Sequence, residues 1–360
     1  MARESLLVFN VSGIGDFVDS VPALRALRKE RPGAFIVLAA AEKVAPLAVG
    51  CPFVDEVIAL PTARGRGFPA LGDLPRWLSK LRPLRGRFST VACLYAVSSP
   101  LGGLWLRALL WWLAPETTIG PRSHGLGNFF SEIVDDPAPG EDAVEGYLKV
   151  ASRVPAPDRT LALWASDEAL KETKAWTSGL ANWGKLDGPL ILVALGGDRA
   201  TRHESPERAA RWLGLLQAKF GIRPILWGTK TDPGLPSNCG VIFEDARGRF
   251  GVAQSAALFR WADAVITTHS APQHLASAWG VPTVVLVGPG DAGLYRPHLP
   301  AESMRMLSRS VPCAPCYFEN CPLTGVDHQK CMSQISPEAF VEAFESILPA
   351  VRKRTAAPKF

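Results

Sequence analysis

A turn that combines two glycines with an aspartate follows the first apolar stretch of the chain. Residues 12–16 read SGIGD directly after the apolar run 5–11, so that Gly13 and Gly15 precede Asp16. Glycines at a strand-to-helix turn let a ligand approach the backbone, and the helix N-terminus attracts negative charge. At the carboxyl end of a sheet, the carboxylate of Asp16 could face an open cleft. In the alternative, Asp16 only stabilises the start of a helix.

A second group of small and polar residues lies toward the other end of the chain. A predicted strand leads to His269 and Ser270, and a predicted helix begins at Ala271. The next apolar run is followed by residues 288–291, which read GPGD. Two adjacent loops with small residues and backbone amides suit a diphosphate. In the alternative, the loops are an ordinary rim of a sheet, and His274 is a hydrogen-bonded structural histidine.

A loop that carries cations follows another predicted strand. A turn at Gly196 comes after the strand 189–195, and the loop beyond it carries Arg202 and His203. Arginine is always charged, whereas histidine titrates near physiological pH. Together with His269, His203 forms a histidine pair that would bind a diphosphate more strongly at low pH.

Four of the seven cysteines are crowded near the C-terminus. Their spacing is Cys313-x2-Cys316-x4-Cys321-x9-Cys331, and His328 lies among them. Four thiolates suit a tetrahedral zinc or iron ion, with a structural role as a clip on the loop. In the alternative, these are plain cysteines in a loop that packs against its own domain. The spacing leaves both interpretations open, because a single pair at ligand spacing is a weak signal.

Elements that alternate between strand and helix must position these residues. Apolar runs of strand length, separated by helical patterns, recur in both halves of the chain. The predicted strands are 5–11, 35–40, 54–60, 189–195, 223–227, 263–267 and 283–287. This alternation predicts parallel βαβ units, and hence an α/β fold with helices on both faces of each sheet.

Capping residues mark two helices of the second half. Ser205, which precedes a proline, predicts a helix start, and Gly221 predicts the end of that helix. Ser336 predicts the start of a last helix that reaches about Leu348. The basic tail 351–360 is expected to fray.

The bulk composition is typical of a globular protein with two domains. The chain has 360 residues, of which 47% are apolar and 20% charged, and its net charge is +5. A chain of this length usually exceeds what one hydrophobic core serves. Its start carries no secretion signal, and the longest apolar stretch, 101–114, is too short to span a bilayer. We therefore expect a cytoplasmic location, where thiols stay reduced.

Cations dominate the segment 62–87, and three tryptophans follow it. The segment holds one acidic residue, Asp73, against Arg64, Arg66, Arg76, Lys80, Arg82, Arg85 and Arg87. These cations could contact an anionic phospholipid or a phosphorylated lipid acceptor, although a solvated basic helix is the simpler interpretation. The tryptophans, Trp105, Trp111 and Trp112, fit a core stripe better than lipid contacts. No nucleic-acid-binding motif accompanies the cations.

Taken together, these motifs resemble glycosyltransferase family 9, the heptosyltransferases. The segments that carry the likeness occur in the family's order over nearly the whole chain, at 10–16, 21–28, 51–58, 269–278, 280–283, 288–291 and 336–338. The resemblance implies a GT-B fold, with two Rossmann-like domains and a cleft between them. The implied division is an acceptor-binding domain over 1–170, a linker over 171–188, a nucleotide-sugar-binding domain over 189–350 and the tail 351–360.

The resemblance also implies an activity and the residues that carry it. The expected reaction is inverting transfer of a sugar, typically heptose from ADP-heptose, to a lipopolysaccharide-core or other glycan acceptor, with Asp16 as general base. Amides of residues 270–272 would stabilise the leaving diphosphate, so no cofactor is required for the chemistry. Lipid-A-linked acceptors would bring the enzyme to the inner membrane as a peripheral protein. The implied donor-binding residues are Gly13, Gly15, Gly196, Arg202, His203, His269, Ser270, Ala271, His274, Gly288, Gly290 and Asp291.

Three departures from the family's pattern keep other functions open. His269 stands where the family usually has an aspartate, Ala271 where it has a glycine, and His203 where it has a lysine that meets the donor phosphate. One alternative is a nucleotide-sugar-binding protein that has lost transfer activity. Others are a GT-B sugar epimerase and a GT-B protein glycosyltransferase with a metal on four cysteines, as in the related autotransporter heptosyltransferases. A Rossmann oxidoreductase fits least, because the third glycine of the dinucleotide fingerprint is missing after Gly15.

Overall fold

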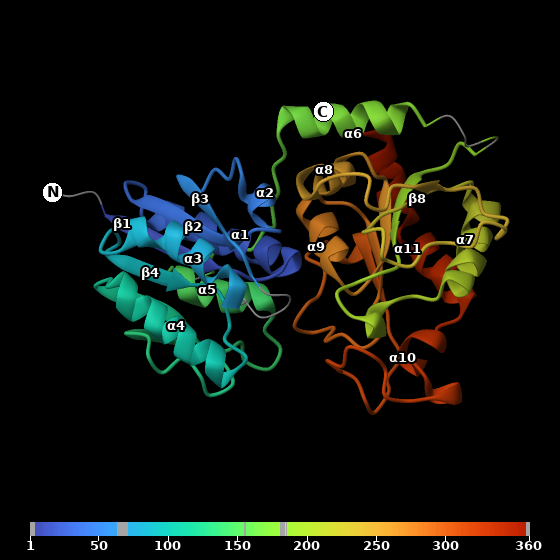
Figure 1. Ribbon diagram of the computed structural model, residues 1–360. Coiled ribbons are helices and arrows are strands. Elements are labelled where there is room, and N and C mark those ends of the chain that lie inside the picture. The colour runs from blue at the N-terminus through green and yellow to red at the C-terminus, as the bar shows by residue number, and fades with distance from the viewer. Residues whose placement is uncertain (1–3, 63–70, 155, 181–183, 185, 358–360) are drawn as a thin grey trace. The chain divides into compact units, whose positions relative to one another are not determined.

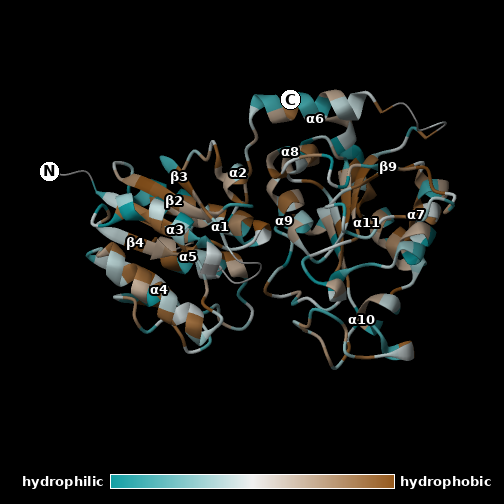
Figure 2. Ribbon diagram, viewed as in Figure 1, coloured by the Kyte–Doolittle hydropathy of each residue, from teal (hydrophilic) through white to brown (hydrophobic). Residues whose placement is uncertain are grey.

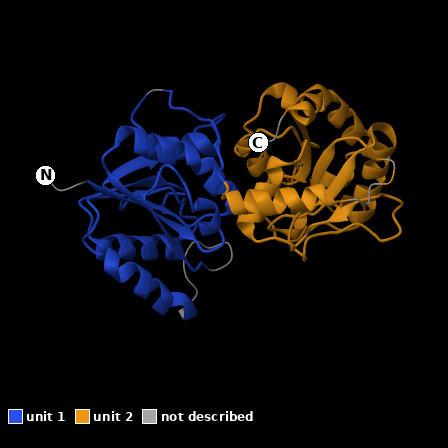
Figure 3. Cartoon of the chain, turned by 90° about the horizontal axis from the view of Figure 1, so that it is seen from above, with its two compact units in different colours: residues 1–164 blue, residues 165–360 orange. Residues whose placement is uncertain are grey.

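The chain divides into two compact units, which are described here one at a time. The computed structural model describes all residues except 1–3, 63–70, 155, 181–183, 185 and 358–360. Residues 1–164 form the first unit and residues 165–360 the second (Figure 3). This division comes earlier in the chain than the predicted linker 171–188. Arg64, Arg66 and Phe68 of the predicted basic segment lie outside the described residues.

The first unit is built on a six-stranded parallel sheet with helices packed on it (Figure 1). The spatial order of the strands is β3-β2-β1-β4-β5-β6. Their bounds are β1 Ser5–Asn10, β2 Phe35–Ala41, β3 Glu56–Leu60, β4 Thr90–Cys93, β5 Thr117–Arg122 and β6 Glu132–Asp135. The helices are α1 Ile14–Glu30, α2 Ala45–Ala48, α3 Leu74–Leu81, α4 Pro100–Leu113 and α5 Ala143–Ala151.

The second unit repeats this architecture with a second six-stranded parallel sheet. Its spatial order is β12-β11-β10-β7-β8-β9. The strands are β7 Leu190–Ala194, β8 Arg223–Leu226, β9 Glu244–Asp245, β10 Ala264–Thr268, β11 Thr283–Leu286 and β12 Met304–Leu307. The helices are α6 Asp167–Ser178, α7 Pro206–Phe220, α8 Val252–Ala257, α9 Ala271–Ala278, α10 Lys330–Ser333 and α11 Pro337–Ala356.

Both sheets have the strand order of a Rossmann-like fold. In each, the first strand lies in the middle, the next two follow on one side, and the last three on the other. The order reverses between β1 and β4 in the first unit, and between β7 and β10 in the second. In open α/β sheets ligands bind outside the carboxyl ends of the strands at such reversal points. The predicted α/β class is therefore confirmed, and each unit has one expected ligand position.

Each sheet is buried by an apolar core of its own. Central strands such as β2 and β7 read as continuous apolar runs because helices cover both faces of each sheet, and Figure 2 colours them as hydrophobic. In the first unit Trp77 is 1% exposed beneath α4. In the second unit the rings of Trp212 and Phe340 stack at 4.6 Å between their centres, which joins α7 to α11.

The capping signals of α7 and α11 are confirmed. The side chain of Ser205 accepts a hydrogen bond from the amide of Arg208, and α7 ends at Gly221, whose φ is +62°. The side chain of Ser336 accepts a hydrogen bond from the amide of Ala339. Both helices thus begin with a serine cap followed by proline, as the sequence predicts.

Two segments are more regular than the sequence predicts. Residues 167–178, partly inside the predicted linker, form α6, whose N-terminus is capped by Ser166. Helix α11 runs beyond Leu348 to Ala356, so the expectation of a frayed tail is wrong for residues 351–356. The reason lies at Arg354, whose guanidinium donates hydrogen bonds to backbone carbonyls, including that of Ala262 at 2.8 Å.

Candidate active site

The loops after β7 and β10 are tied together at the reversal point of the second sheet. The hydroxyl of Thr268 donates a hydrogen bond of 2.6 Å to the carbonyl of Gly196, and the hydroxyl of Ser270 donates one of 3.1 Å to the same oxygen. Because β7 and β10 are adjacent parallel strands, their carboxyl ends lie side by side. The predicted residues Gly196 and Ser270 thus belong to one cluster at the expected ligand position.

The glycines of the β7 loop are required by close packing. A Cβ atom added to Gly196 would lie 2.1 Å from a carboxylate oxygen of Asp232. A Cβ atom added to Gly197 would lie 3.3 Å from the Cβ atoms of both Arg202 and Ser270. Glycine therefore lets the loop, its cation and the start of α9 approach one another.

Arg202 brings a cation to this cluster. Its side chain is 17% exposed and forms an ion pair of 3.1 Å with Asp198, which is itself 65% exposed. The Nε atom of Arg202 is buried and has no hydrogen-bond partner among the described residues. A buried donor without a partner is costly, and an anionic ligand would satisfy it. Arg202 is therefore the best candidate for a contact with a phosphate.

His203 is occupied by its own loop. Its Nε2 atom lies 3.1 Å from the carbonyl oxygen of Gly197, so this nitrogen carries the hydrogen and donates. That bond closes the loop over residues 197–203, and a direct contact with a ligand would have to come from the other ring nitrogen. Of the two cations that the sequence offers at this place, Arg202 has the donor without a partner.

His269 is a neutral, buried histidine. It is 3% exposed, and its Nε2 atom lies 2.6 Å from the carbonyl oxygen of Tyr295. Burial, together with the nearby charges of His274 and Arg202, lowers the pKa of His269 to about 4. The expectation that His269 strengthens anion binding at mildly low pH is therefore wrong, because the ring stays uncharged until about pH 4.

The turn at 288–291 packs directly on His269. A Cβ atom added to Gly290 would lie 1.9 Å from Nδ1 of His269, so only glycine fits at this position. Gly288 has a φ of +56°, and a Cβ atom there would lie 2.2 Å from the sulfur of Met332. The carboxylate of Asp291 accepts hydrogen bonds of 3.0 Å from the amides of Gly293 and Leu294, which marks it as a turn former.

The start of α9 offers fewer free amides than the three that were expected at residues 270–272. Pro272 has no N–H group, and the amide of Gln273 donates to the carbonyl of Ser270 at 3.2 Å. The amides of Ser270 and Ala271 therefore remain the candidates for an anion at this N-terminus.

Gln273 and His274 lie inside the first turns of α9 and are buried. The Nε2 atom of Gln273 lies 3.1 Å from Nε2 of His274 and donates a hydrogen bond of 2.9 Å to the carbonyl of Tyr295. The Oε1 atom of Gln273 has no hydrogen-bond partner among the described residues. Gln273 and Tyr295 were not predicted, and only the position of Gln273 one turn into α9 could have signalled it.

The cysteine loop, residues 313–331, forms hydrogen bonds to the loop after β7 and to the 288–291 turn. The hydroxyl of Thr201 donates a hydrogen bond of 2.8 Å to the carbonyl of Phe318, and the side chain of Gln329 donates one of 2.8 Å to the carbonyl of Ala200. On the other side, the amide of Cys316 donates one of 2.9 Å to the carbonyl of Pro289. The loop thus connects the segment that carries Arg202 to the glycine turn.

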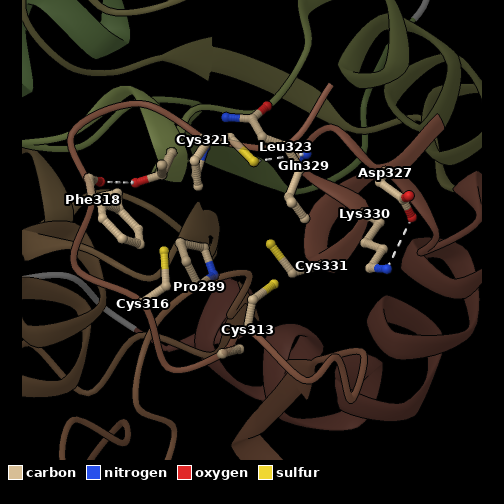
Figure 4. Close-up of a pocket in the computed structure, with 13 residues that line it drawn as sticks. Pro289, Cys313, Cys316, Phe318, Cys321, Leu323, Asp327, Gln329, Lys330 and Cys331 are labelled. Carbon is tan, nitrogen blue, oxygen red and sulfur yellow. Dashed lines mark hydrogen bonds and ion pairs between the residues drawn. The ribbon is translucent and has the colours of Figure 1, made fainter. Parts of the chain in front are cut away.

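The four cysteines of this loop line one cavity of about 60 Å³ (Figure 4). The structure brings together Cys313, Cys316, Cys321 and Cys331, as their crowding in the sequence suggests. Burial raises the pKa of the Cys331 thiol to about 11. Across the described part of the chain, no three histidine, cysteine or acidic side chains are placed to hold a metal ion. The metal site on these cysteines stays a prediction.

Asp16 lies at the reversal point of the first sheet, at the start of α1. One carboxylate oxygen accepts a hydrogen bond of 3.1 Å from the amide of Gly13, and the other lies 3.4 Å from the hydroxyl of Tyr147 on α5. Asp16 is half-buried and belongs to the third position of the helix, where its charge also favours the helix N-terminus. Asp16 can therefore stabilise the start of α1 and still be reached by a ligand.

Two tyrosines next to Asp16 were missed by sequence reasoning. Tyr147 contacts its carboxylate from α5, and Tyr95 follows β4 on the other side of the reversal point. Burial raises the pKa of Tyr95, and the negative charges of Cys93 and Asp16 raise it further, so its hydroxyl stays protonated. A polar residue just after β4 was the available signal for Tyr95, whereas nothing local marked Tyr147.

The predicted residues thus fall into two clusters. Gly13, Gly15 and Asp16 belong to the first unit, and Gly15 lies inside the first turn of α1. All other predicted donor residues belong to the second unit, around the ends of β7, β10 and β11.

Comparisons with known proteins bear on the second cluster directly. Residues 238–326 match the family model of glycosyltransferase family 9 (heptosyltransferase). The resemblance to family 9 is confirmed. The matched segment contains α9 with its preceding loop and the 288–291 turn. A family 9 relative, the lipooligosaccharide heptosyltransferase 2 of Campylobacter jejuni, is 33% identical over 86 residues, which are 24% of this chain and 26% of that protein. The chain thus matches about a quarter of this curated relative.

Solved structures extend the likeness with family 9 to the whole fold. The E. coli ADP-heptose lipopolysaccharide heptosyltransferase II covers 98% of this chain with 100% of its own, at 19% identity and a TM-score of 0.73. A family 9 glycosyltransferase from Veillonella parvula covers 96% of this chain with 97% of its own, at 20% identity and a TM-score of 0.75. The predicted GT-B fold, with two Rossmann-like units in one chain, is confirmed.

The structure has no membrane-spanning helix in the residues it describes. Helix α4 is strongly apolar, yet neither it nor any other described helix has the length and composition to cross a bilayer.

Proposed function

We propose that this protein is an inverting glycosyltransferase that moves a sugar from a nucleotide-diphosphate donor to a glycan. By analogy with the family 9 relatives, the donor is ADP-heptose and the acceptor a lipopolysaccharide-core sugar. The observation that supports this most is the cluster at β7 and β10, where a buried Arg202 donor lacks a partner beside the N-terminus of α9. An arginine and helix amides suit a diphosphate leaving group.

The donor phosphates are proposed to bind in the second unit. Arg202 would neutralise charge that develops on the leaving diphosphate, and the amides of Ser270 and Ala271 would donate hydrogen bonds to it. Gly290 and Gly288 let the neighbouring turn come close, while His269 fills the space beneath it as a neutral group. His269 is therefore proposed to act through packing against the 288–291 turn.

Asp16 is proposed as the general base in the first unit. It would accept the proton of the acceptor hydroxyl as that oxygen attacks the anomeric carbon of the donor sugar. The amide of Gly13 and the hydroxyl of Tyr147 lie within 3.1 and 3.4 Å of its two oxygens and hold the carboxylate in place. Tyr95, kept protonated, would be a second neutral donor near the acceptor.

The cysteine loop is proposed as a clip that fixes the donor loops. Its hydrogen bonds to Ala200, Thr201 and Pro289 hold both sides of the phosphate cluster. A zinc or iron ion on the four cysteines would strengthen the clip without entering the reaction. Metal analysis of the purified chain tests whether this ion is bound. The Cys239→Ser variant is the control, because Cys239 is not one of the four cysteines that line the cavity.

A nucleotide-sugar-binding protein without transfer activity is the second candidate. It is favoured by the replacement of the family's usual aspartate with His269, which is neutral and bonded to Tyr295. The two candidates differ in whether turnover accompanies donor binding.

The proposal is tested by binding and transfer with the Asp16→Asn variant. We expect ADP and ADP-heptose to bind wild-type protein and the variant equally, and transfer to a lipid-A-linked acceptor to fall by at least about a hundredfold in the variant. Asp19→Asn is a poor control because Asp19 is buried, so the exposed Asp187→Asn serves instead for general charge effects on the fold. Binding without turnover in the wild type would support the second candidate, and an Asp16→Asn enzyme of full rate would rule out the assigned base.

A further inference from the structure

One face of α4 presents large apolar side chains to solvent. Leu101 and Leu104 are each 66% exposed and Trp111 is 80% exposed, and Ala108 between them is also exposed. At about 100° per residue, these four positions lie within about 80° of one another around the helix axis. We call them the α4 face. Trp111 therefore departs from the expected core stripe, whereas Trp105 and Trp112 are half-buried.

The opposite side of α4 anchors the helix in the core. Leu106, Leu109, Leu110 and Leu113 are at most 8% exposed and pack with β-strand residues and with α3. The ring of Trp105 meets that of Trp77 at 4.5 Å in an edge-to-face contact. The rotation of α4 is thus set by its buried side, and its outer face is held toward solvent.

Cations without counterions lie beside the α4 face. Between Asp73 and Glu116 the chain has no acidic residue but six cations. Two of these, Arg76 and Lys80, lie near Glu42. Arg107 lies on α4 next to Trp111 in the helical projection, and the guanidinium of Arg85 lies 6.0 Å from the Trp112 ring centre. In the described part of the chain no ion pair involves Arg85 or Arg107.

A backbone contact places Arg85 at the end of α4. The amide of Gly86 donates a hydrogen bond of 2.9 Å to the carbonyl of Leu113, which is the last residue of the helix. Arg82, Arg85 and Arg87 are all exposed on this segment. The apolar surface therefore has a basic rim at its C-terminal end, in addition to Arg107 along its side.

We propose that the α4 face docks on a bilayer surface that contains anionic phospholipid. An interfacial helix combines apolar and aromatic residues on one face with lysine or arginine beside it, and α4 has this pattern. Its 14 residues span about 21 Å, so the helix lies on the surface and does not cross it. The arginines pair with lipid phosphates while Leu101, Leu104 and Trp111 enter the headgroup boundary. The inference uses surface chemistry alone and does not rest on the proposed transferase activity.

The charge pattern favours a bilayer over a second copy of the chain. Two α4 faces brought together would bury arginines of like charge against each other, which costs free energy. An anionic lipid surface neutralises the same arginines. A dimer is therefore the competing outcome that the experiment must separate.

Vesicle binding of the full chain tests the proposal. We expect sedimentation with phosphatidylcholine vesicles that contain about 30% phosphatidylglycerol, weak binding to pure phosphatidylcholine, and release at high salt. Leu104→Asp/Trp111→Asp removes apolar contact, and Arg85→Glu/Arg107→Glu reverses charge. Because each cation near an anionic surface contributes about fivefold, the second variant should weaken binding by more than about 25-fold.

Matched variants control for folding and for general charge. Arg211→Glu/Leu215→Asp changes an exposed arginine and an exposed leucine on α7 of the second unit and should bind vesicles like the wild type. Trp111→Phe keeps the α4 face apolar, so it should bind normally but lose part of the fluorescence quenching by brominated lipid. Circular dichroism and thermal unfolding verify that each variant is folded.

Three results would overturn the proposal. The wild type could fail to sediment with anionic vesicles, or folded α4 variants could bind as tightly as the α7 control. Ultracentrifugation could also reveal a dimer that the α4 variants dissociate, in which case the face is an interface between copies.

Discussion

At the scale of single residues, burial decides what the predicted side chains can do. His269 is 3% exposed, and burial lowers its pKa to about 4. A sequence motif names the imidazole but not its surroundings, so the expected low-pH effect failed at this residue. Arg202, by contrast, brings a permanent charge and a buried donor to the cluster, and its contact with a phosphate stays a prediction.

The lowered pKa of His269 predicts an acid-sensitive fold. In the unfolded chain the imidazole has an ordinary pKa of about 6.5, so it takes up a proton that the folded state refuses until about pH 4. Stability contributed by His269 is thus complete above pH 6.5 and is lost as pH falls toward 4, by at most about 3 kcal/mol. Urea unfolding at pH 7.5 and 4.5 should show a larger loss in wild type than in His269→Gln. Equal losses of unfolding free energy in wild type and His269→Gln would contradict the lowered pKa of His269.

Arg202 should carry much of the affinity for the donor phosphates. We expect Arg202→Ala to weaken ADP binding by about tenfold or more, because a charge-assisted hydrogen bond contributes about 1.5–3 kcal/mol. Arg211→Ala is the comparison, since Arg211 is an exposed arginine on α7 of the same unit. Calorimetric titration with ADP measures both. An unchanged affinity in Arg202→Ala would shift the phosphate contact to His203 or to the backbone.

At the scale of elements, packing between loops explains why particular glycines are needed. The 288–291 motif was recognisable in the sequence, but its contact with His269 joins residues that are 21 positions apart. Seven of the strands, the serine caps of α7 and α11 and the two glycine turns were predictable because each depends on local pattern. The short or polar strands β4, β5, β6, β9 and β12 were not predicted. Tyr147, Tyr95 and Gln273 were not predictable, since their place at the site depends on which strands and helices become neighbours.

Gly290→Ala should therefore damage the cluster, whereas Gly293→Ala should not. The added methyl group would overlap His269 at 1.9 Å in the first case and meet Asp291 at an ordinary 3.4 Å in the second. We expect Gly290→Ala to cost about 1–3 kcal/mol of unfolding free energy and to weaken ADP binding as the turn shifts. Denaturant unfolding and nucleotide titration of the two variants provide the comparison. If the two variants have similar unfolding free energies and similar affinities for ADP, the 288–291 turn can shift to accommodate the methyl group at no cost.

At the scale of the whole molecule, each unit contains its own sheet, core and ligand position. The proposed donor residues Arg202, Ser270 and Gly290 all belong to the second unit, and Asp16 with its two tyrosines belongs to the first. The order of motifs along the chain was enough to predict this two-part fold. The unit boundary was harder to locate, because residues 166–187 look polar and loop-like while part of them folds as α6.

Binding of ADP should therefore protect one unit selectively. We expect amide hydrogen exchange to slow in residues 195–203 and 268–274 and in the 288–291 turn, because these segments surround the proposed phosphate position. Exchange in α4 and around Asp16 should change little with nucleotide alone. Mass spectrometry of the full chain with and without ADP measures this. Protection confined to the first unit would assign the donor to the other sheet.

Trp164, at the end of the first unit, suggests where the chains of two related proteins could be joined. Trp164 packs edge-on against Phe17 and Phe53, and its indole nitrogen donates a hydrogen bond to the carbonyl of Val49. A chimaera joined just after Trp164 keeps this anchor together with the contacts of Asp16 to Gly13 and Tyr147. If the proposed function holds, hybrid proteins cut at that point should exchange donor preference and acceptor preference as separate, inheritable modules.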